Sequence, residues 1–303
     1  MPGKTTTKFV CNGAPPKPDE FVKIYVTQRE YDRESAAARR VLELDPESRW
    51  TVVPYRWCTV PTRLLQTERE LCSGVAKLDE DATVAVAVMR SAGPSLDRSE
   101  PAGALADVRR VAGEVAGGLR MLHRGGVYHL DVKPGNVCVG ERARLIDFGL
   151  SAPTPREVAQ YATGQGTNPN YPPGIGDPKR RAELAEAYRE KHPAGTLALL
   201  GADERPVSDP AAMSPEDLGA VVDAWGLGYT VCFMLHRAPR LLAELAADDG
   251  GAADLRAALR GLLSGDPARA RGALRALDPT RDSENDVPDG SPGRDGPLSA
   301  GDA

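Results

Sequence analysis

Residues 129 to 149, which read HLDVKPGNVCVGERARLIDFG, carry the most specific pattern in the chain. Two short apolar runs, Val137 to Val139 and Leu145 to Ile146, lie on either side of a turn at Gly140. This arrangement predicts a β-hairpin. Asn136 comes directly before the first strand of the hairpin and Asp147 directly after the second. Because the two strands pair, we expect these two polar side chains to lie close together.

The order of these residues resembles the catalytic core of a protein kinase. The resemblance implies an α+β, bilobal fold with a small β-rich N-lobe and a mainly helical C-lobe, and ATP and Mg²⁺ as cofactors. It also implies that Asp131 accepts the proton of the substrate hydroxyl and that Lys133 neutralises the transferring phosphoryl group. Asn136 and Asp147 would bind Mg²⁺. His129 fits a packing and hydrogen-bonding residue of the loop better than a base.

The predicted N-lobe begins with a strand at residues 21–26 and a helix at residues 28–44. In the family that this resembles, the strand lysine holds the α and β phosphates and pairs with a glutamate of the helix. Lys23 fits the lysine. Glu34 is the expected partner, because the apolar residues that follow it would keep one helix face against the sheet, and Glu30 is the rival.

Two further strands are predicted at residues 50–54 and 82–88. The segment after the second strand, residues 89–93, resembles the hinge between the lobes. The resemblance places Met89 and Ser91 beside the adenine of the nucleotide.

The predicted C-lobe contains a helix at residues 106–123, whose apolar residues repeat at helical spacing. A later helix begins at Asp223 and resembles the central helix of the kinase large lobe, whose leading aspartate anchors the catalytic-loop backbone. Thr167 and Tyr171 resemble substrate-docking positions of the activation segment. That segment ends at Gly174 in the favoured alignment and at Glu216 in the alternative one.

The expected organisation is an N-lobe at residues 1–91, a C-lobe at 92–277 with an insertion around 175–215, and a disordered tail at 278–303. The tail is expected because it is rich in Pro, Gly, Asp and Ser and has few apolar residues. The insertion contains a predicted helix at residues 177–192. The glycine-rich phosphate loop of the family is missing or shortened, since only Gly3 and Gly13 precede Lys23.

Composition excludes some classes of function. The net charge of −5 does not favour a nucleic-acid or membrane surface as the main partner. The apolar stretch at residues 220–235 is too short to span a bilayer and contains Asp223. No secretory signal is visible, and the five cysteines are scattered and odd in number, so we expect no disulfide framework and a reducing, intracellular location in cytoplasm or nucleus.

Lys133, two residues after Asp131, resembles the serine/threonine class, so the expected partners are protein substrates with Ser or Thr acceptors. Leu130 stands where many kinases carry an arginine that pairs with a phosphorylated activation loop. The compact chain also resembles kinases of large DNA viruses, including the herpesvirus type, which would place it in a host cell. Two alternatives stay open: a pseudokinase scaffold, which the shortened loop favours, and a small-molecule phosphotransferase of the aminoglycoside-kinase type.

Overall fold

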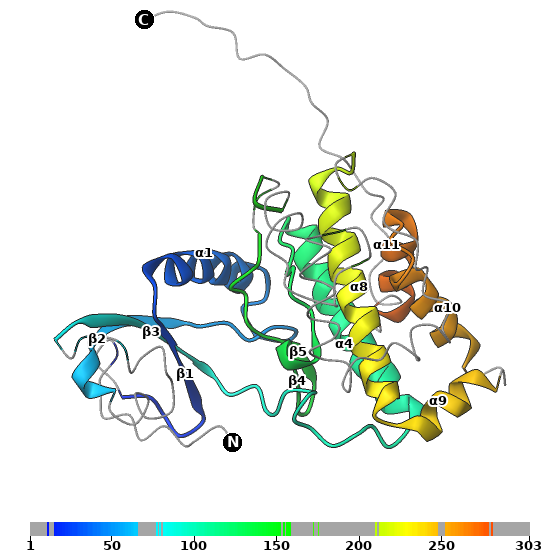
Figure 1. Cartoon of the computed structure of the whole chain (residues 1–303), viewed down its shortest axis with the longest axis horizontal. Coiled ribbons are helices and arrows are strands. Elements are labelled where there is room, and N and C mark those ends of the chain that lie inside the picture. Colours follow the sequence, from blue (N-terminus) through cyan, green and yellow to red (C-terminus); the bar gives the residue numbers. More distant parts are fainter. Residues whose placement is uncertain are drawn as a thin grey trace, which may run out of the picture.

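The computed structural model places a small sheet with one covering helix beside a larger group of helices, with a short hairpin between them (Figure 1). This arrangement confirms the α+β class with a small β-rich lobe and a mainly helical lobe. The structure describes residues 11, 15–65, 77, 79, 81–152, 154, 156–158, 172, 175, 210, 212–247, 252–278 and 280.

The small lobe has an antiparallel sheet in the order β1-β3-β2, formed by Glu20–Tyr25, Thr83–Arg90 and Arg56–Pro61. Side chains alternate between its two faces. Val22 packs in a satellite cluster with the valines of β3, whereas Lys23 and Tyr25 point to the other face. Helix α1, Gln28–Leu44, covers that second face and begins where Thr27 Oγ1 accepts a hydrogen bond from the Glu30 amide.

The strand predicted at residues 50–54 is wrong. Only Thr51 forms a bridge there, to Leu145, and Val52 N donates to the Leu145 carbonyl at 2.9 Å. This segment therefore joins the hairpin of the large lobe. Pro54 has no amide hydrogen to extend the ladder, and the strand of the small lobe begins after it, at Arg56.

The cysteine prediction is also wrong, because Cys11 and Cys58 form a disulfide with their Cα atoms 5.4 Å apart. The two residues are 47 positions apart in the chain, so no local spacing signals their pairing. The bond lies within the satellite cluster on the sheet face opposite α1. The reducing, intracellular location stays an untested prediction. Cys138 and Cys232 are free and buried.

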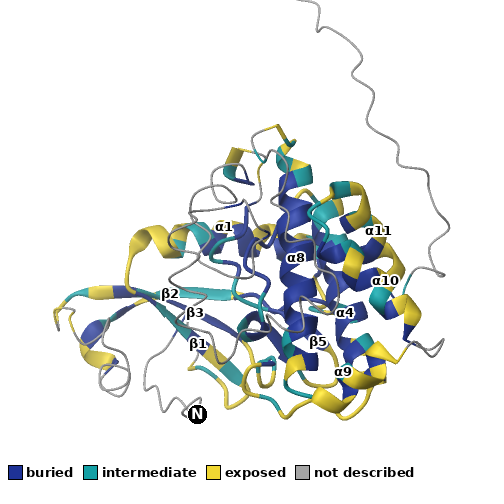
Figure 2. Ribbon diagram, turned by 45° about the vertical axis from the view of Figure 1, so that its right-hand side comes forward, coloured by how far each residue is buried: buried dark blue, intermediate teal, exposed yellow. Residues whose placement is uncertain are grey.

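The large lobe contains helices that pack around a common apolar core, drawn in dark blue in Figure 2. Its first helix, α4, covers Leu105–Arg124, and the hairpin strands β4 and β5 cover Val137–Val139 and Ala143–Leu145. A short 3₁₀ turn, η2, occupies Pro134–Asn136 just before β4, and another, η1, at Thr62–Leu64, follows β2 of the small lobe. The remaining helices are α8 (Pro215–His236), α9 (Pro239–Ala246), α10 (Ala253–Leu262) and α11 (Pro267–Leu277).

Helix α8 runs through the centre of this lobe. It begins at the Ser214 cap, whose Oγ accepts from the Asp217 amide at 3.1 Å. Asp223 therefore lies inside the helix, and the prediction that it begins the helix is wrong. By length and composition α8 could cross a membrane, but 94% of its most apolar window is buried in the protein. Its apolar surface is therefore used in packing.

The predicted tail starts too early. Asp278 is buried, forms an ion pair with Arg120 of α4, and accepts hydrogen bonds from the backbone and hydroxyl of Thr280. A buried carboxylate with these partners belongs to the folded lobe. Residues 281–303, the rest of the predicted tail, lie outside the described residues.

Candidate active site

The catalytic-loop backbone is held by one buried carboxylate of α8. The Asp223 side chain is fully buried and accepts hydrogen bonds from His129 N at 2.9 Å and Leu130 N at 2.7 Å. The His123 ring, at the end of α4, lies 2.8 Å from the same carboxylate. Gly226 permits this approach, since a Cβ there would lie 2.5 Å from the Val132 carbonyl oxygen. Helix α8 therefore holds the backbone of the catalytic loop in place through Asp223.

The loop turns sharply at Leu130, which is buried and has a φ of 58°. A non-glycine residue in this region is strained and persists only where its surroundings hold it, here through the two bonds to Asp223. The turn presents Asp131 to two donors. Lys133 Nζ lies 2.6 Å and Asn136 Nδ2 lies 2.8 Å from Asp131 Oδ2.

The β4–β5 hairpin brings the next pair of residues together. Asn136 immediately precedes β4, and its carbonyl accepts from Ile146 N at 3.0 Å, directly before Asp147. His129 also contacts this end of the hairpin, with Nε2 3.0 Å from the Ile146 carbonyl oxygen and its ring 4.8 Å from that of Phe148. This is a packing position for His129.

Asp147 has a φ of 63° and is, with Ser48 and Leu130, one of three non-glycine residues with a positive φ among those described. Its Oδ1 faces Lys23, whose Nζ lies 2.8 Å away. The same ammonium lies 2.6 Å from Glu34 Oε2 of α1, whereas the rival Glu30 is exposed. Lys23 therefore joins the sheet, helix α1 and the hairpin end in one charged cluster.

Lys23 stabilises both carboxylates of this cluster, but burial first, and then the Asp147 carboxylate, raise the pKa of Glu34 above its usual value. Burial alone lowers the pKa of Lys23, but the Asp147 and Glu34 carboxylates outweigh it, so the pKa lies above its usual value. Burial raises the pKa of Asp147, yet Lys23 first, and then His129 and Lys133, hold it below its usual value. Asp147 is thus an ionised carboxylate beside an ammonium.

Two residues of the site were not predicted. Arg33 of α1 is half-buried and donates from Nη1 to the Gly149 carbonyl at 3.2 Å, so α1 reaches the loop after Asp147 directly. Tyr25 is buried two residues after Lys23, and the Lys23 ammonium lies 5.5 Å from the centre of its ring. Period-two alternation along β1 could have indicated Tyr25. No local signal distinguishes Arg33 from the exposed arginines of α1.

The predicted hinge, residues 89–93, begins inside β3, whose last two residues are Met89 and Arg90. Met89 is buried, whereas Ser91 is exposed and donates its amide hydrogen to the Asp19 carbonyl at 2.9 Å. The chain then crosses the hairpin at Gly93, which has a φ of 89°. A Cβ at this position would lie 2.9 Å from the Val139 carbonyl oxygen. The crossing therefore requires a residue without a side chain.

The donor atoms near Asp147 fit a magnesium ion. Nδ2 of Asn136 donates to Asp131, which leaves the amide oxygen of Asn136 as the atom available to a cation, and the Asp147 side chain is 42% exposed. Both groups are hard oxygen donors. Within the described residues, no cluster of three or more His, Cys, Asp or Glu could hold a metal by itself. Mg²⁺ suits such an incomplete set, since it commonly takes one or two protein ligands and completes its shell with phosphates and water.

Some predicted site residues lie outside the described residues: Thr167, Tyr171, Gly174 and the insertion helix at residues 177–192. Glu216, the alternative end of the activation segment, is described. It lies exposed in the first turn of α8, next to Pro215.

Comparison with known proteins agrees with this site. Residues 91–179 match the family model described as "Protein kinase domain". Mitogen-activated protein kinase p38a of Drosophila melanogaster is 42% identical over 50 residues, which are 16% of this chain and 14% of that protein. Serine/threonine-protein kinase mos of Xenopus laevis is 52% identical over 56 residues, 18% of this chain and 15% of that protein.

The chain thus spans about one-seventh of the length of the curated relatives that it matches, and the family model covers the catalytic loop and the hairpin. Residues 91–179 are therefore similar to a protein kinase domain, and the two-lobed fold is consistent with that similarity. These matches do not support the viral origin that the chain's compact character suggested.

Proposed function

We propose that this chain is a serine/threonine protein kinase that transfers the γ-phosphate of ATP to hydroxyl groups of protein substrates. One observation carries the proposal. Two polar clusters lie next to each other: Asp131 with Lys133 and Asn136, and Lys23 with Glu34 and Asp147. The amide of Ile146, the residue before Asp147, donates to the Asn136 carbonyl at 3.0 Å and so joins the two clusters. Phosphoryl transfer needs this combination of a base, cations and metal ligands.

In the proposed reaction, the acceptor hydroxyl lies at Asp131, which orients it and takes its proton as the new P–O bond forms and the bond to the β-phosphate breaks. Lys133, 2.6 Å from Asp131, is placed to neutralise charge on the transferred group. Lys23 would contact the α and β phosphates. Asn136 and Asp147 would hold Mg²⁺, and the metal would neutralise charge on the β and γ phosphates.

The acceptor class rests on Lys133 and on relatives that are named as MAP and serine/threonine kinases over short segments. A small-molecule phosphotransferase is the less favoured reading, because Lys133 and the Asp223 anchor both suit a protein kinase. A pseudokinase scaffold would not need the full set of Lys23, Asp131, Asn136 and Asp147 in contact with charged partners.

The test compares Asp131→Asn with the unsubstituted chain. We expect transfer of labelled phosphate to a generic protein substrate to fall about 10²- to 10⁴-fold, the range for loss of a positioned base. Thermal stabilisation by Mg-ATP should stay, since Asp131 does not hold the nucleotide. Asp81→Asn, at a side chain that is 94% exposed, is the control.

Phosphoamino-acid analysis of the product should show phosphoserine and phosphothreonine. Mainly phosphotyrosine would contradict the acceptor class. Transfer to an aminoglycoside but not to protein would favour the second enzyme class, and Mg-ATP binding without any transfer would favour the scaffold.

A further inference from the structure

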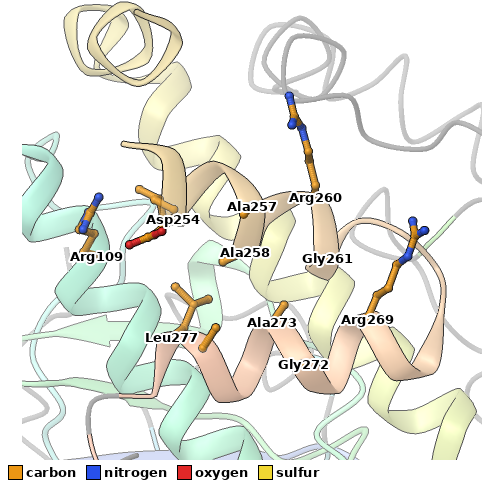
Figure 3. A pocket seen from close by; sticks show the side chains of 12 residues that line it. Arg109, Asp254, Ala257, Ala258, Arg260, Gly261, Arg269, Gly272, Ala273 and Leu277 are labelled. Atoms are coloured by element: carbon orange, nitrogen blue, oxygen red, sulfur yellow. The ribbon is translucent and has the colours of Figure 1, made fainter. Parts of the chain in front are cut away.

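A groove of about 810 Å³ lies between α10, α11 and the start of α4 (Figure 3). Small and aliphatic side chains of the two C-terminal helices form its floor, among them Ala258, Ala273 and Leu277. Arg260 and Arg269 project from the rim at one end, and Arg109 lies beside Asp254 at the other, as Figure 3 shows. None of these residues belongs to the candidate active site.

The helices that form the groove are basic on an otherwise acidic chain. Residues 253–277 contain five arginines, two aspartates and no lysine or glutamate, whereas the whole chain has a net charge of −5. Two of the arginines are used internally: Arg256 donates to the Leu245 carbonyl at 2.9 Å, and Arg271 pairs with Asp217. Arg260 and Arg269 are exposed and have no side-chain partner in the described part of the chain.

Arg109 adds an unfilled hydrogen-bonding group at the groove. Its Nη2 atom is shielded from solvent and has no acceptor among the described residues. A buried guanidinium N–H without an acceptor is unfavourable, and native proteins rarely leave one so. An anionic group that entered the groove at this end would supply the acceptor.

Gly272 is an exposed glycine that lines the groove. It lies inside α11, where glycine is less favourable than alanine, and a Cβ at this position would meet no atom within 4 Å. Gly261 across the groove is different, because its Cβ would lie 2.8 Å from that of Ala273. Packing within the chain therefore explains Gly261 but not Gly272.

We propose that the groove binds an acidic segment of a partner protein. An apolar side chain of the segment would rest on the alanines of the floor, beside Gly272, and flanking carboxylates would reach Arg260, Arg269 and Arg109. Arg guanidinium groups bind carboxylates through paired N–H donors, and complementary charge selects the partner and speeds its association. The inference goes beyond phosphoryl transfer and does not depend on it.

Fluorescence anisotropy tests the proposal on the full chain. The probe is a labelled synthetic peptide in which a pair of leucines is flanked by six glutamates, and its control has glutamine at each glutamate position. We expect salt-sensitive binding of the acidic peptide only. Arg260→Glu with Arg269→Glu should weaken binding about tenfold or more, because two attractive contacts become repulsive.

The matched control is Arg275→Glu, an exposed arginine of the same helix that does not line the groove, which should change binding less than about twofold. Gly272→Leu should block the groove while it leaves the helix at least as stable, since leucine is the better helix former. Equal binding of both peptides, or equal loss with Arg275→Glu, would overturn the proposal.

The chain's own C-terminal segment is the competing occupant, because residues 281–303 contain six acidic and two basic residues. A full-length variant with Asp282→Asn, Glu284→Gln and Asp286→Asn separates the two cases. The partner proposal predicts that this variant binds the acidic peptide like the unsubstituted chain. Binding that appears only in the variant would assign the groove to the chain's own segment and would overturn the proposal.

Discussion

Asp223→Asn should destabilise the protein far more than a change of one atom suggests. The carboxylate is fully buried and accepts from His129 N, Leu130 N and the His123 ring. Asparagine keeps one acceptor oxygen but sets an N–H₂ group against a backbone N–H, so at least one donor loses its partner. Hydrogen bonds to a charged group contribute about 1.5–3 kcal/mol each, and we expect a loss of about 3 kcal/mol.

Urea unfolding followed by tryptophan fluorescence measures this loss, and Trp225, buried two residues after Asp223, reports on the same helix. The midpoint should fall while the slope stays constant. The control is Asp217→Asn on the same helix, where the side chain is 31% exposed and pairs with Arg271, and it should cost no more than about 1 kcal/mol. Equal effects of the two substitutions would refute the reasoning that Asp223 anchors the loop.

Three further outcomes are expected. Arg33→Ala should weaken Mg-ATP binding or turnover about tenfold, because a hydrogen bond to the Gly149 carbonyl is lost, whereas Arg39→Ala on the exposed face of α1 should leave both unchanged in steady-state kinetics. Deletion of residues 278–303 should lower the melting temperature, since it removes the buried partner of Arg120, but deletion of 281–303 should not; equal melting temperatures would contradict the packing of Asp278. Cys58→Ser should reduce stability by about 2–4 kcal/mol in unfolding titrations under oxidising conditions and should add one free thiol, that of Cys11, whereas a count that falls by one would argue against the disulfide.

Sequence patterns predicted the fold well where one element carried its own signal. The helix at 28–44 has the predicted bounds, and the hairpin lies where the apolar runs and the Gly140 turn placed it. The order of charged residues around the hairpin was enough to indicate the family. Elements whose identity depends on distant partners were missed, as at Thr51, which pairs with Leu145 of the other lobe.

In the candidate site, too, residues with a local sequence signal were predicted and residues that depend on distant partners were missed. Lys23 and Glu34 could be paired in advance, because the periodicity of α1 sets which face meets the sheet. Arg33 could not be identified, since its partner is a backbone carbonyl 116 residues away, and no sequence signal selects one arginine of the helix for that contact. The Cys11–Cys58 bond likewise depends on how the segment before β1 lies against β2, which no residue spacing reveals.

The central claim is that the Lys23–Asp147 cluster and Asp131 serve metal-dependent transfer of phosphate from ATP. The most direct test measures transfer of labelled phosphate to serine and threonine of a generic protein, with Mg²⁺, by the full chain and by Asp147→Ala. We predict transfer by the full chain, and loss of both transfer and thermal stabilisation by Mg-ATP in the variant, because Mg²⁺, which would neutralise the β and γ phosphates, would lose its carboxylate ligand. Unchanged stabilisation by Mg-ATP in Asp147→Ala, or equal transfer by both proteins, would contradict the account.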